Sequence, residues 1–171
     1  MKFLADRTTG KLARKLRALG FDVVYRGGGP VEEAAEVAST EGRMFLTRSR
    51  RLPEKGGDLR VTVIEADDPR EQLREVLTKL KMEPSAGQFF SRCLMCNEIL
   101  LSVSKEEVEG TVPDFIYRSY DSFHACPRCR RVFWPGTHLQ RMKRELAGIH
   151  PETPYSPSPS TGEGKGRVGK D

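Results

Sequence analysis

Cys93-Leu94-Met95-Cys96 and Cys126-Pro127-Arg128-Cys129 are two Cys-x-x-Cys pairs that together contain all four cysteines of the chain. Closely spaced cysteines of this kind sit on sharp turns, where both thiolates of a pair can face one ion. Two such turns brought together by short strands complete the tetrahedral four-sulfur shell that Zn²⁺ prefers. The alternative is a pair of disulfides or four unrelated buried thiols. The pattern favours a zinc ribbon, and a shell closed by four cysteines leaves no open position for a catalytic water.

Length and composition indicate a soluble globular protein with one ordinary domain and a smaller one. The chain has 171 residues, of which 37% are hydrophobic and 31% are charged. The first apolar run, Phe3-Leu4-Ala5, ends at Asp6 and is too short for the core of a signal peptide. No run approaches the length of a membrane span. Paired metal-type cysteines without a secretion signal predict a cytoplasmic location and no membrane partner.

Upstream of the cysteine pairs, strand and helix patterns alternate along the chain. We expect strands at 2–5, 21–25, 43–47 and 59–64, and helices at 9–19, 31–40 and 67–81. This alternation predicts an α/β fold, a parallel sheet with helices on its faces. The run Gly27-Gly28-Gly29 lacks the Lys-Ser/Thr of a phosphate loop, so we expect a flexible connection there.

A change in composition near Pro84-Ser85-Ala86-Gly87 separates two predicted domains. We expect the first over 1–83, a zinc ribbon with a terminal helix over 88–147, and a disordered tail over 148–171. In the ribbon, strands are expected at 99–103 and 132–134. The aromatic residues expected to cover its small core are Tyr117, Tyr120, Phe123 and Trp134. His124 and His138 are expected to be packing or surface residues, because four cysteines already saturate one zinc ion.

Positive charge is concentrated in two places. Residues 1–20 carry six cations against the single acid Asp6, and residues 48–51 carry three arginines. The six cations are Lys2, Arg7, Lys11, Arg14, Lys15 and Arg17. Clustered cations attract phosphate backbones without reading sequence, which indicates RNA or another phosphate polymer as partner. The alternative is a solvated helix face.

Acidic residues are expected near the carboxyl ends of the strands, where open α/β sheets bind ligands. Asp6 ends the first strand, Asp22 opens the second, and Asp67 and Asp68 follow the fourth. Carboxylates beside so many cations indicate a Mg²⁺ or Mn²⁺ site facing a phosphate. The alternative is that Asp6 pairs with nearby cations or caps a helix, and that Asp67 and Asp68 cap the last helix.

Several ordered motifs resemble the Mut-seven C-terminal (Mut-seven-C) RNase domain family. The similarity covers residues 2–146. The motifs are the stretches 3–7, 10–22, 41–48, 72–77, 103–108 and 134–138, together with both cysteine turns. The resemblance implies a PIN-like nuclease fold, here a three-layer parallel sheet, followed by a four-cysteine zinc ribbon.

The same resemblance implies a metal-dependent hydrolase, an endoribonuclease that cleaves RNA phosphodiester bonds. Asp6 and Asp22 fall on the acidic positions of the family and are therefore candidates for catalysis and for binding Mg²⁺ or Mn²⁺. Lys11, Arg14 and Arg48 are the candidates for holding the RNA backbone.

Two departures from the family pattern bear on activity. Ser49 stands where the family has Asp after Thr47-Arg48, and Pro30-Val31 stands where it tends to have acids, with Glu32 and Glu33 close by. A neutral hydroxyl weakens Mg²⁺ affinity and mispositions the attacking water, unless the acids after the fourth strand compensate. The alternative function is a non-catalytic RNA-binding or ribonucleoprotein-interaction module with a structural zinc ribbon.

Overall fold

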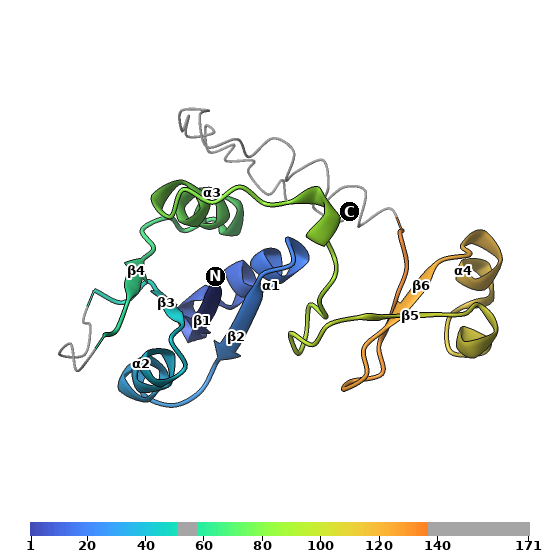
Figure 1. Ribbon diagram of the computed structural model, residues 1–171, viewed down its shortest axis with the longest axis horizontal. Coiled ribbons are helices and arrows are strands. Elements are labelled where there is room, and N and C mark those ends of the chain that lie inside the picture. Colours follow the sequence, from blue (N-terminus) through green and yellow to red (C-terminus); the bar gives the residue numbers. More distant parts are fainter. Residues whose placement is uncertain (51–57, 137–171) are drawn as a thin grey trace, which may run out of the picture.

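The computed structural model describes residues 1–50 and 58–136, which form two parts joined near residue 86 (Figure 1). The first part contains a four-stranded sheet and the second a three-stranded sheet. No helix among these residues is long and apolar enough to cross a membrane. The predicted terminal helix and the tail over 148–171 lie outside the described residues, so the domain limits stay predictions.

The first sheet is parallel throughout, as the alternation of strands and helices predicted. Its order is β2-β1-β3-β4. The strands are β1 (Lys2–Asp6), β2 (Asp22–Arg26), β3 (Met44–Thr47) and β4 (Val61–Val63), and the helices are α1 (Gly10–Ala18), α2 (Val31–Thr40) and α3 (Pro69–Lys79). A short 3₁₀ turn over Arg7–Thr9 precedes α1. Helix α3 begins later than expected because the Asp68 side chain accepts hydrogen bonds from the first free N–H groups.

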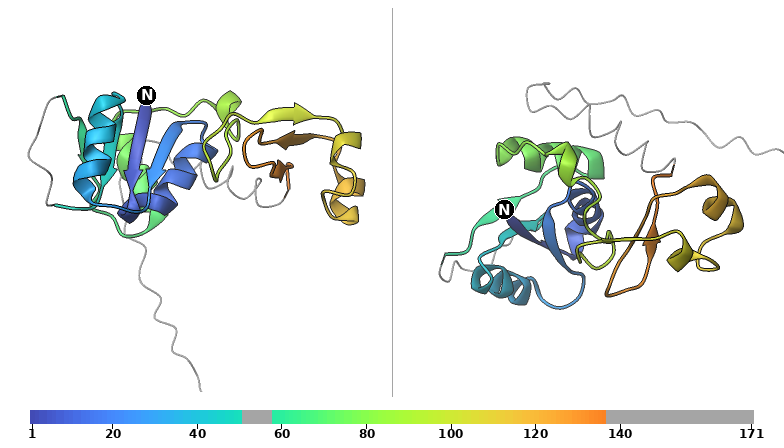
Figure 2. Two further views of the ribbon diagram at one scale, coloured as in Figure 1. Left: turned by 90° about the horizontal axis from the view of Figure 1, so that it is seen from below. Right: turned by 45° about the vertical axis from the view of Figure 1, so that its right-hand side comes forward.

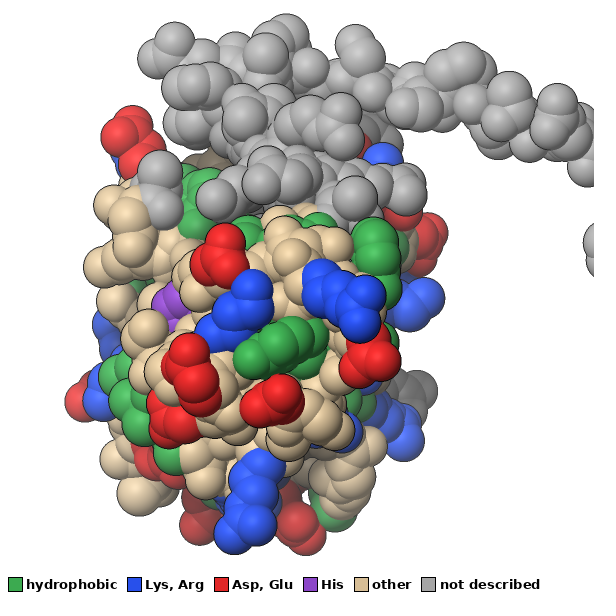
Figure 3. Space-filling model, turned by 90° about the vertical axis from the view of Figure 1, so that its right-hand side faces the viewer, with side chains coloured by type: hydrophobic (Ala, Val, Ile, Leu, Met, Phe, Trp, Pro, Cys, Tyr) green, Lys and Arg blue, Asp and Glu red, His purple; other side chains and the backbone are tan. Residues whose placement is uncertain are grey.

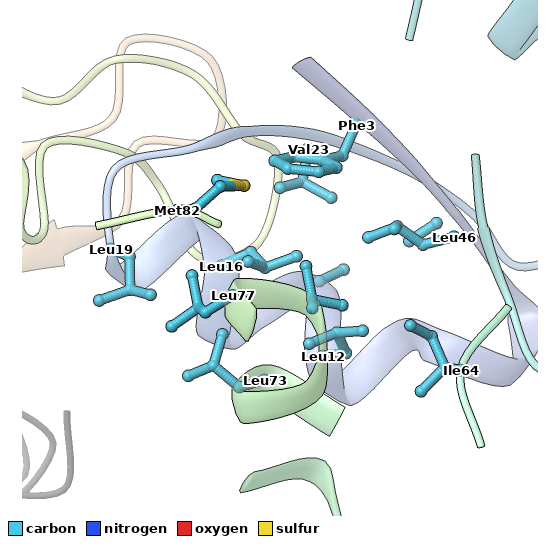
Figure 4. Close-up of a cluster of buried hydrophobic side chains, with 13 residues drawn as sticks. Phe3, Leu12, Leu16, Leu19, Val23, Leu46, Ile64, Leu73, Leu77 and Met82 are labelled. Atoms are coloured by element: carbon cyan, nitrogen blue, oxygen red, sulfur yellow. The ribbon is translucent and has the colours of Figure 1, made fainter. Parts of the chain in front are cut away.

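Helices α1 and α3 cover one face of this sheet and α2 covers the other, which confirms the three-layer prediction. Side chains alternate along β1, so that Phe3 packs with α1 and α3 while Leu4 packs with α2. Figure 4 shows the larger core, in which leucines of α1 and α3 meet beneath the sheet. They are Leu12, Leu16, Leu73 and Leu77.

The strand order reverses beside β1. The chain passes from β1 through α1 to β2 on one side, and then through α2 to β3 on the other side. Loops leave such a switch point in opposite directions and open a crevice at the carboxyl ends of the two central strands. Asp6 of β1 and Thr47 of β3 lie there, in hydrogen-bond contact.

The second part is the ribbon, an antiparallel sheet of order β5-β6-β7. Its elements are β5 (Leu101–Val103), α4 (Asp114–Ser119), β6 (Phe123–Ala125) and β7 (Val132–Phe133). The expected flanking strands are confirmed, and the segment between the cysteine pairs adds β6 and α4. Phe123 is fully buried with Tyr117, Tyr120 and Trp134 packed around it, as predicted. Figure 2 shows α4 at the end of the ribbon farthest from the parallel sheet.

Leu16 is fully buried in the larger core, whereas Leu101 is 54% exposed on the ribbon. We expect Leu16→Ala to lower the free energy of unfolding by about 2–5 kcal/mol, because it loses buried methyl groups and leaves a cavity. Leu101→Ala is expected to change it by no more than about 0.5 kcal/mol. Denaturant unfolding of both variants measures the difference, and equal losses would contradict this placement of the core.

Candidate functional site

A pocket of about 300 Å³ lies at the carboxyl ends of the central strands. Its walls come from the end of β1, the loop between β2 and α2, the first turn of α2 and the chain after β3. The charged residues that line it are Asp6, Arg7, Arg26 and Glu32, and Ser49 adds a hydroxyl group. The pocket therefore joins segments that lie far apart in the sequence.

Asp6 is 4% exposed, and its carboxylate is held by threonines instead of cations. Oδ1 accepts hydrogen bonds from the backbone N–H of Thr8 at 2.9 Å and from the Thr8 hydroxyl at 2.5 Å. Oδ2 accepts one from the Thr47 hydroxyl at 2.6 Å. Asp6 thus caps the turn that follows β1, which was the alternative reading of this residue. The cap does not use the whole carboxylate, because Oδ2 keeps a second lone pair.

The same threonines tie the chain after β3 to Asp6. The backbone N–H of Arg48 donates to the Thr8 hydroxyl, and that of Ser49 donates to the Thr47 hydroxyl, both at 2.9 Å. Each of the two hydroxyls accepts a hydrogen bond from the backbone after β3 and donates one to the Asp6 carboxylate. This relay fixes the position of Ser49 relative to Asp6.

These residues fit a divalent cation of the Mg²⁺ type. Mg²⁺ is usually held by one or two carboxylates, with water and substrate phosphate completing its shell. Asp6 supplies one oxygen from the pocket wall, Glu32 supplies an exposed carboxylate at the rim, and Ser49 supplies a neutral hydroxyl. The set of acidic ligands is smaller than the sequence predicts, because only two acids are among the described residues that line the pocket.

The glycine loop after β2 is a wall of this pocket. Gly28 and Gly29 both line it, and Gly29 has a φ of +82°. A Cβ at Gly29 would be strained and would lie 3.0 Å from the Glu33 carboxylate. The sequence alone predicts only a flexible connection here. The signal in the sequence was a glycine run placed directly after a strand.

The three cations predicted to hold RNA do not line the pocket among its described residues. Lys11 and Arg14 lie exposed on α1, and the Arg48 guanidinium pairs with Asp67. Arg7 and Arg26 line it instead. Arg26 pairs with Asp6 in the register of β1 and β2, which brings it to the same edge. Sequence reasoning missed Arg26 because only that register reveals its place.

The acids after β4 do not compensate for Ser49 in the structure. Asp67 forms the ion pair with Arg48, and Asp68 accepts hydrogen bonds from the N–H groups of Arg70 and Glu71 at the start of α3. The capping alternative is therefore correct for Asp68. Neither acid is among the described residues that line the pocket.

Asp22 and Asp6 lie at opposite ends of paired strands, so the expected convergence of these two carboxylates is wrong. In the parallel register Lys2 faces Asp22, and Asp6 faces Arg26. Four residues of strand separate the two positions by roughly 13 Å at about 3.3 Å per residue. One metal ion cannot bind both side chains directly.

Asp22 instead lies in a hydrogen-bond network at the amino end of the strands. Its Oδ1 accepts from Nη1 of Arg43 at 2.7 Å and from Nδ2 of Asn97 at 2.8 Å. Burial alone would raise the pKa of the Asp22 carboxyl, but the hydrogen bonds from Arg43 and Asn97 outweigh it and hold that pKa below its ordinary value. Asp22 therefore links β2 to β3 and to the first cysteine turn.

The four cysteines form one cluster, as predicted. Their sulfur atoms all lie within 4.8 Å of one another, close to the spacing of about 3.8 Å that a tetrahedral Zn²⁺ with bonds of about 2.3 Å requires. The thiols are free, which excludes the disulfide alternative in this structure. Burial raises the pKa of three of them, and a backbone hydrogen bond from Arg131 lowers the pKa of Cys129 to about 6. The donor set fits Zn²⁺.

The two cysteine turns have the same backbone geometry. The N–H of Cys93 donates to Glu98 O and that of Cys126 to Arg131 O. The residue after each second cysteine is left-handed, with φ of 72° at Asn97 and 58° at Arg130. His124 lies on β6 and does not belong to the cluster, and His138 lies outside the described residues.

A larger pocket of about 570 Å³ lies between the linker and the ribbon. Its walls include Phe89, Phe90, Phe133 and Trp134 and are mostly apolar. No carboxylate is among its described lining residues, so it offers no ligand for a hard cation. The smaller pocket at Asp6 therefore remains the candidate catalytic site.

A switch-point pocket with a buried aspartate, joined to a four-cysteine ribbon, defines the class of two-part nuclease domains that the sequence motifs resemble. The model of the family described as Mut7-C RNAse domain matches residues 1–146. The chain belongs to this family.

The chain is also similar to a human protein named Exonuclease mut-7 homolog. The two are 32% identical over 111 residues, which is 61% of this chain and 13% of that protein. The chain thus spans a small part of this relative's length. No solved structure matches the chain significantly. Family and relative together support a nuclease function.

Asp22→Asn tests the structural network at the amino edge. We expect a loss of about 1–3 kcal/mol in the free energy of unfolding at pH 7, because hydrogen bonds to a charged group are broken. The folded pKa of Asp22 is lowered, so its contribution is complete above the unfolded value of about 4 and is lost as the pH falls through the folded value. The variant and the wild type should therefore converge in denaturant unfolding as the pH is lowered below the unfolded value. A difference that persists unchanged in acid would contradict this origin.

The cysteine cluster predicts one Zn²⁺ per chain. Metal analysis of the purified protein should find it, and Cys129→Ser should lose most of it, because three thiolates and a neutral hydroxyl hold the ion far less tightly. Ser102→Ala on the neighbouring strand is the control and should retain the metal. A metal-free protein whose mass is lower by the hydrogens released from two disulfides would show that the cluster is oxidised instead.

Proposed function

We propose that this chain is a metal-dependent endoribonuclease that hydrolyses RNA phosphodiester bonds in the pocket at Asp6. The observation that carries the proposal is the position of a buried carboxylate at the switch point, facing a pocket with two arginines and a second acid. Family membership supports the nuclease reaction. The metal ion, RNA as the substrate and endonucleolytic cleavage are our proposals beyond that nuclease function.

The proposed roles follow from charge and position. Arg7 and Arg26 hold the phosphate that enters the pocket, because guanidinium groups match phosphate oxygens in geometry and charge. Asp6 and Glu32 are the residues that would hold Mg²⁺ or Mn²⁺. A divalent cation bound there supplies charge that offsets the phosphate and makes water a better nucleophile. Asp6 keeps its orientation through the threonine hydroxyls, so the carboxylate is preorganised.

Ser49 sets the expected level of activity. The relay through Thr47 brings the backbone of Ser49 to the side of Asp6 where a third acid would complete the ligand set. A serine there removes one negative charge and weakens cation binding. We therefore propose a nuclease that is slow and needs high concentrations of metal.

RNA is proposed to run along the carboxyl edge instead of the outer end of the ribbon. Figure 3 shows acidic and basic side chains mixed on the face that carries α4, with no area of one sign. A surface of that kind gives little attraction to a phosphate backbone. The exposed Phe115 on α4 suits an apolar contact and not a phosphate backbone.

Three variants test the site with one assay. Wild type, Asp6→Asn, Ser49→Asp and Asp22→Asn are incubated with linear and circular RNA of one sequence, in Mg²⁺ and in Mn²⁺. We expect Asp6→Asn to lower the cleavage rate by about 10²-fold or more, by analogy with the loss of one preorganised electrostatic group. Ser49→Asp should raise the rate at low metal. The folded Asp22→Asn variant should cleave at the wild-type rate, because residue 22 lies at the amino edge of the sheet and not at the pocket.

Each outcome bears on a separate part of the proposal. Cleavage of circular RNA supports an endonuclease, and cleavage of linear RNA alone overturns that part. Equal cleavage by wild type and Asp6→Asn would place the reaction elsewhere or in a contaminant. Salt-sensitive RNA binding without cleavage by any form would favour the non-catalytic RNA-binding module.

A further inference from the structure

The first cysteine turn, residues 93–97, is docked on the parallel sheet by hydrogen bonds from both sides. Arg17 of α1 donates from Nη1 to the carbonyl oxygens of Leu94 at 3.0 Å and Met95 at 2.9 Å. In the other direction, the Asn97 side chain accepts from the N–H of Val23 at 2.9 Å and donates to Asp22. The first turn thus contacts the end of α1 and the start of β2.

This contact covers an exposed edge of the nuclease sheet. Strand β2 is the edge strand, and both backbone groups of Val23 are paired by side chains, one from the docked turn and one from α1. Its N–H is bound by Asn97 and its carbonyl oxygen by Nε of Arg17 at 2.9 Å. An unpaired sheet edge is a site of fraying and of association with other chains. The first turn therefore acts as the cover that a further strand would otherwise provide.

The residues of the first turn that contact the sheet domain lie between or directly after the two cysteines that would bind the metal. Leu94 and Met95 lie between Cys93 and Cys96, inside the ring that closes when both sulfurs bind one ion. Asn97 follows directly and has a left-handed backbone, with φ of 72°. Binding of both sulfurs to one ion therefore restrains the directions of these carbonyls and the backbone from which the Asn97 side chain projects.

Charge links the same two sites. Arg17 is only 5% exposed, and a zinc ion with four thiolates carries a net charge of −2. Burial lowers the pKa of the Arg17 guanidinium, while the Cys93 and Cys96 thiolates act in the opposite direction. Because a buried cation and a negative metal centre stabilise each other, each favours the charged form of its neighbour.

We propose that zinc binding at the ribbon and the order of the β2 edge are thermodynamically linked through Arg17 and Asn97, so that zinc acts as a switch on the stability of the nuclease domain. Loss of zinc frees the first turn, removes the hydrogen bond from the N–H of Val23 to Asn97 and opens the edge of the sheet. Linkage is reciprocal, so a change at Arg17 or Asn97 also weakens zinc retention.

The matched pair Asn97→Gly and Arg130→Gly tests the proposal. Both positions follow the second cysteine of a turn and have positive φ, which glycine adopts without strain. Only Asn97 contacts the sheet in the described structure, since Arg130 is exposed on the second turn. The two variants therefore make the same backbone change and differ in the docking contact.

The measurements use the full-length, zinc-loaded protein and do not depend on nuclease activity. Hydrogen exchange of residues 20–26 is followed before and after zinc is removed by a chelator, and zinc release to a chromogenic chelator is timed. We expect exchange at Val23 to rise about tenfold or more on zinc removal and in Asn97→Gly, and zinc release to quicken about tenfold in Asn97→Gly. Arg130→Gly should stay within about twofold of wild type in both measurements.

Exchange at residues 20–26 that is unaffected by zinc removal would overturn the proposal, as would equal behaviour of the two glycine variants. If Asn97→Gly does not fold, Arg17→Met takes its place, since it keeps the aliphatic stem and removes the hydrogen bonds to both carbonyls. Zinc retention by Arg17→Met at the wild-type level would then contradict the linkage.

Discussion

Parallel pairing of β1 with β2 and β3 decides where the charged side chains of the nuclease domain lie. The carboxyl ends of these strands meet at one edge and bring together Asp6, Arg26 and the chain around Ser49. Their amino ends meet at the other edge, where Asp22 and Arg43 pair. A carboxylate placed at the start of a strand cannot reach a ligand at its end, because the pleated backbone between them is rigid and extended. The register thus separates two acids that look equivalent in the sequence.

At the carboxyl edge, the pocket relies on hydroxyl groups for its geometry. Thr8 and Thr47 donate to Asp6 and accept from the backbone of the chain after β3. Hydroxyls suit this task, since each can donate and accept at once. The carboxylate is buried yet stays free of direct pairing with Arg7 or Arg26 in the described contacts. Those arginines line the same pocket as Asp6 and Glu32, so the site has mixed charge.

At the amino edge, one asparagine joins the two parts of the molecule. Asn97 bonds the backbone of β2 and the side chain of Asp22, and Arg17 reaches back to the carbonyls of the same turn. The ribbon is therefore part of the nuclease fold in physical terms, since it caps an edge strand that would otherwise be open. The linker strengthens this join through the bond from the N–H of Phe90 to Ala18 O. The turn that carries Cys93 and Cys96 is thus in direct contact with the parallel-sheet domain.

Local patterns in the sequence determined the order of strands and helices, the cluster of four cysteines, and the position of Asp6 at a strand end. These depend on hydrophobic period and on short spacings, which act over a few residues. Tertiary structure alone decided that Arg26 and Glu32 line the same pocket as Asp6, that Arg48 forms an ion pair with Asp67, and that Asp22 belongs to the ribbon contact. Asp22 and Asn97 lie 75 residues apart, and their bond forms only after a sheet edge and a metal-type turn have packed together. Pairing across such a distance depends on strand register and on the packing of preformed elements. Neither can be predicted from the spacing of residues along the chain.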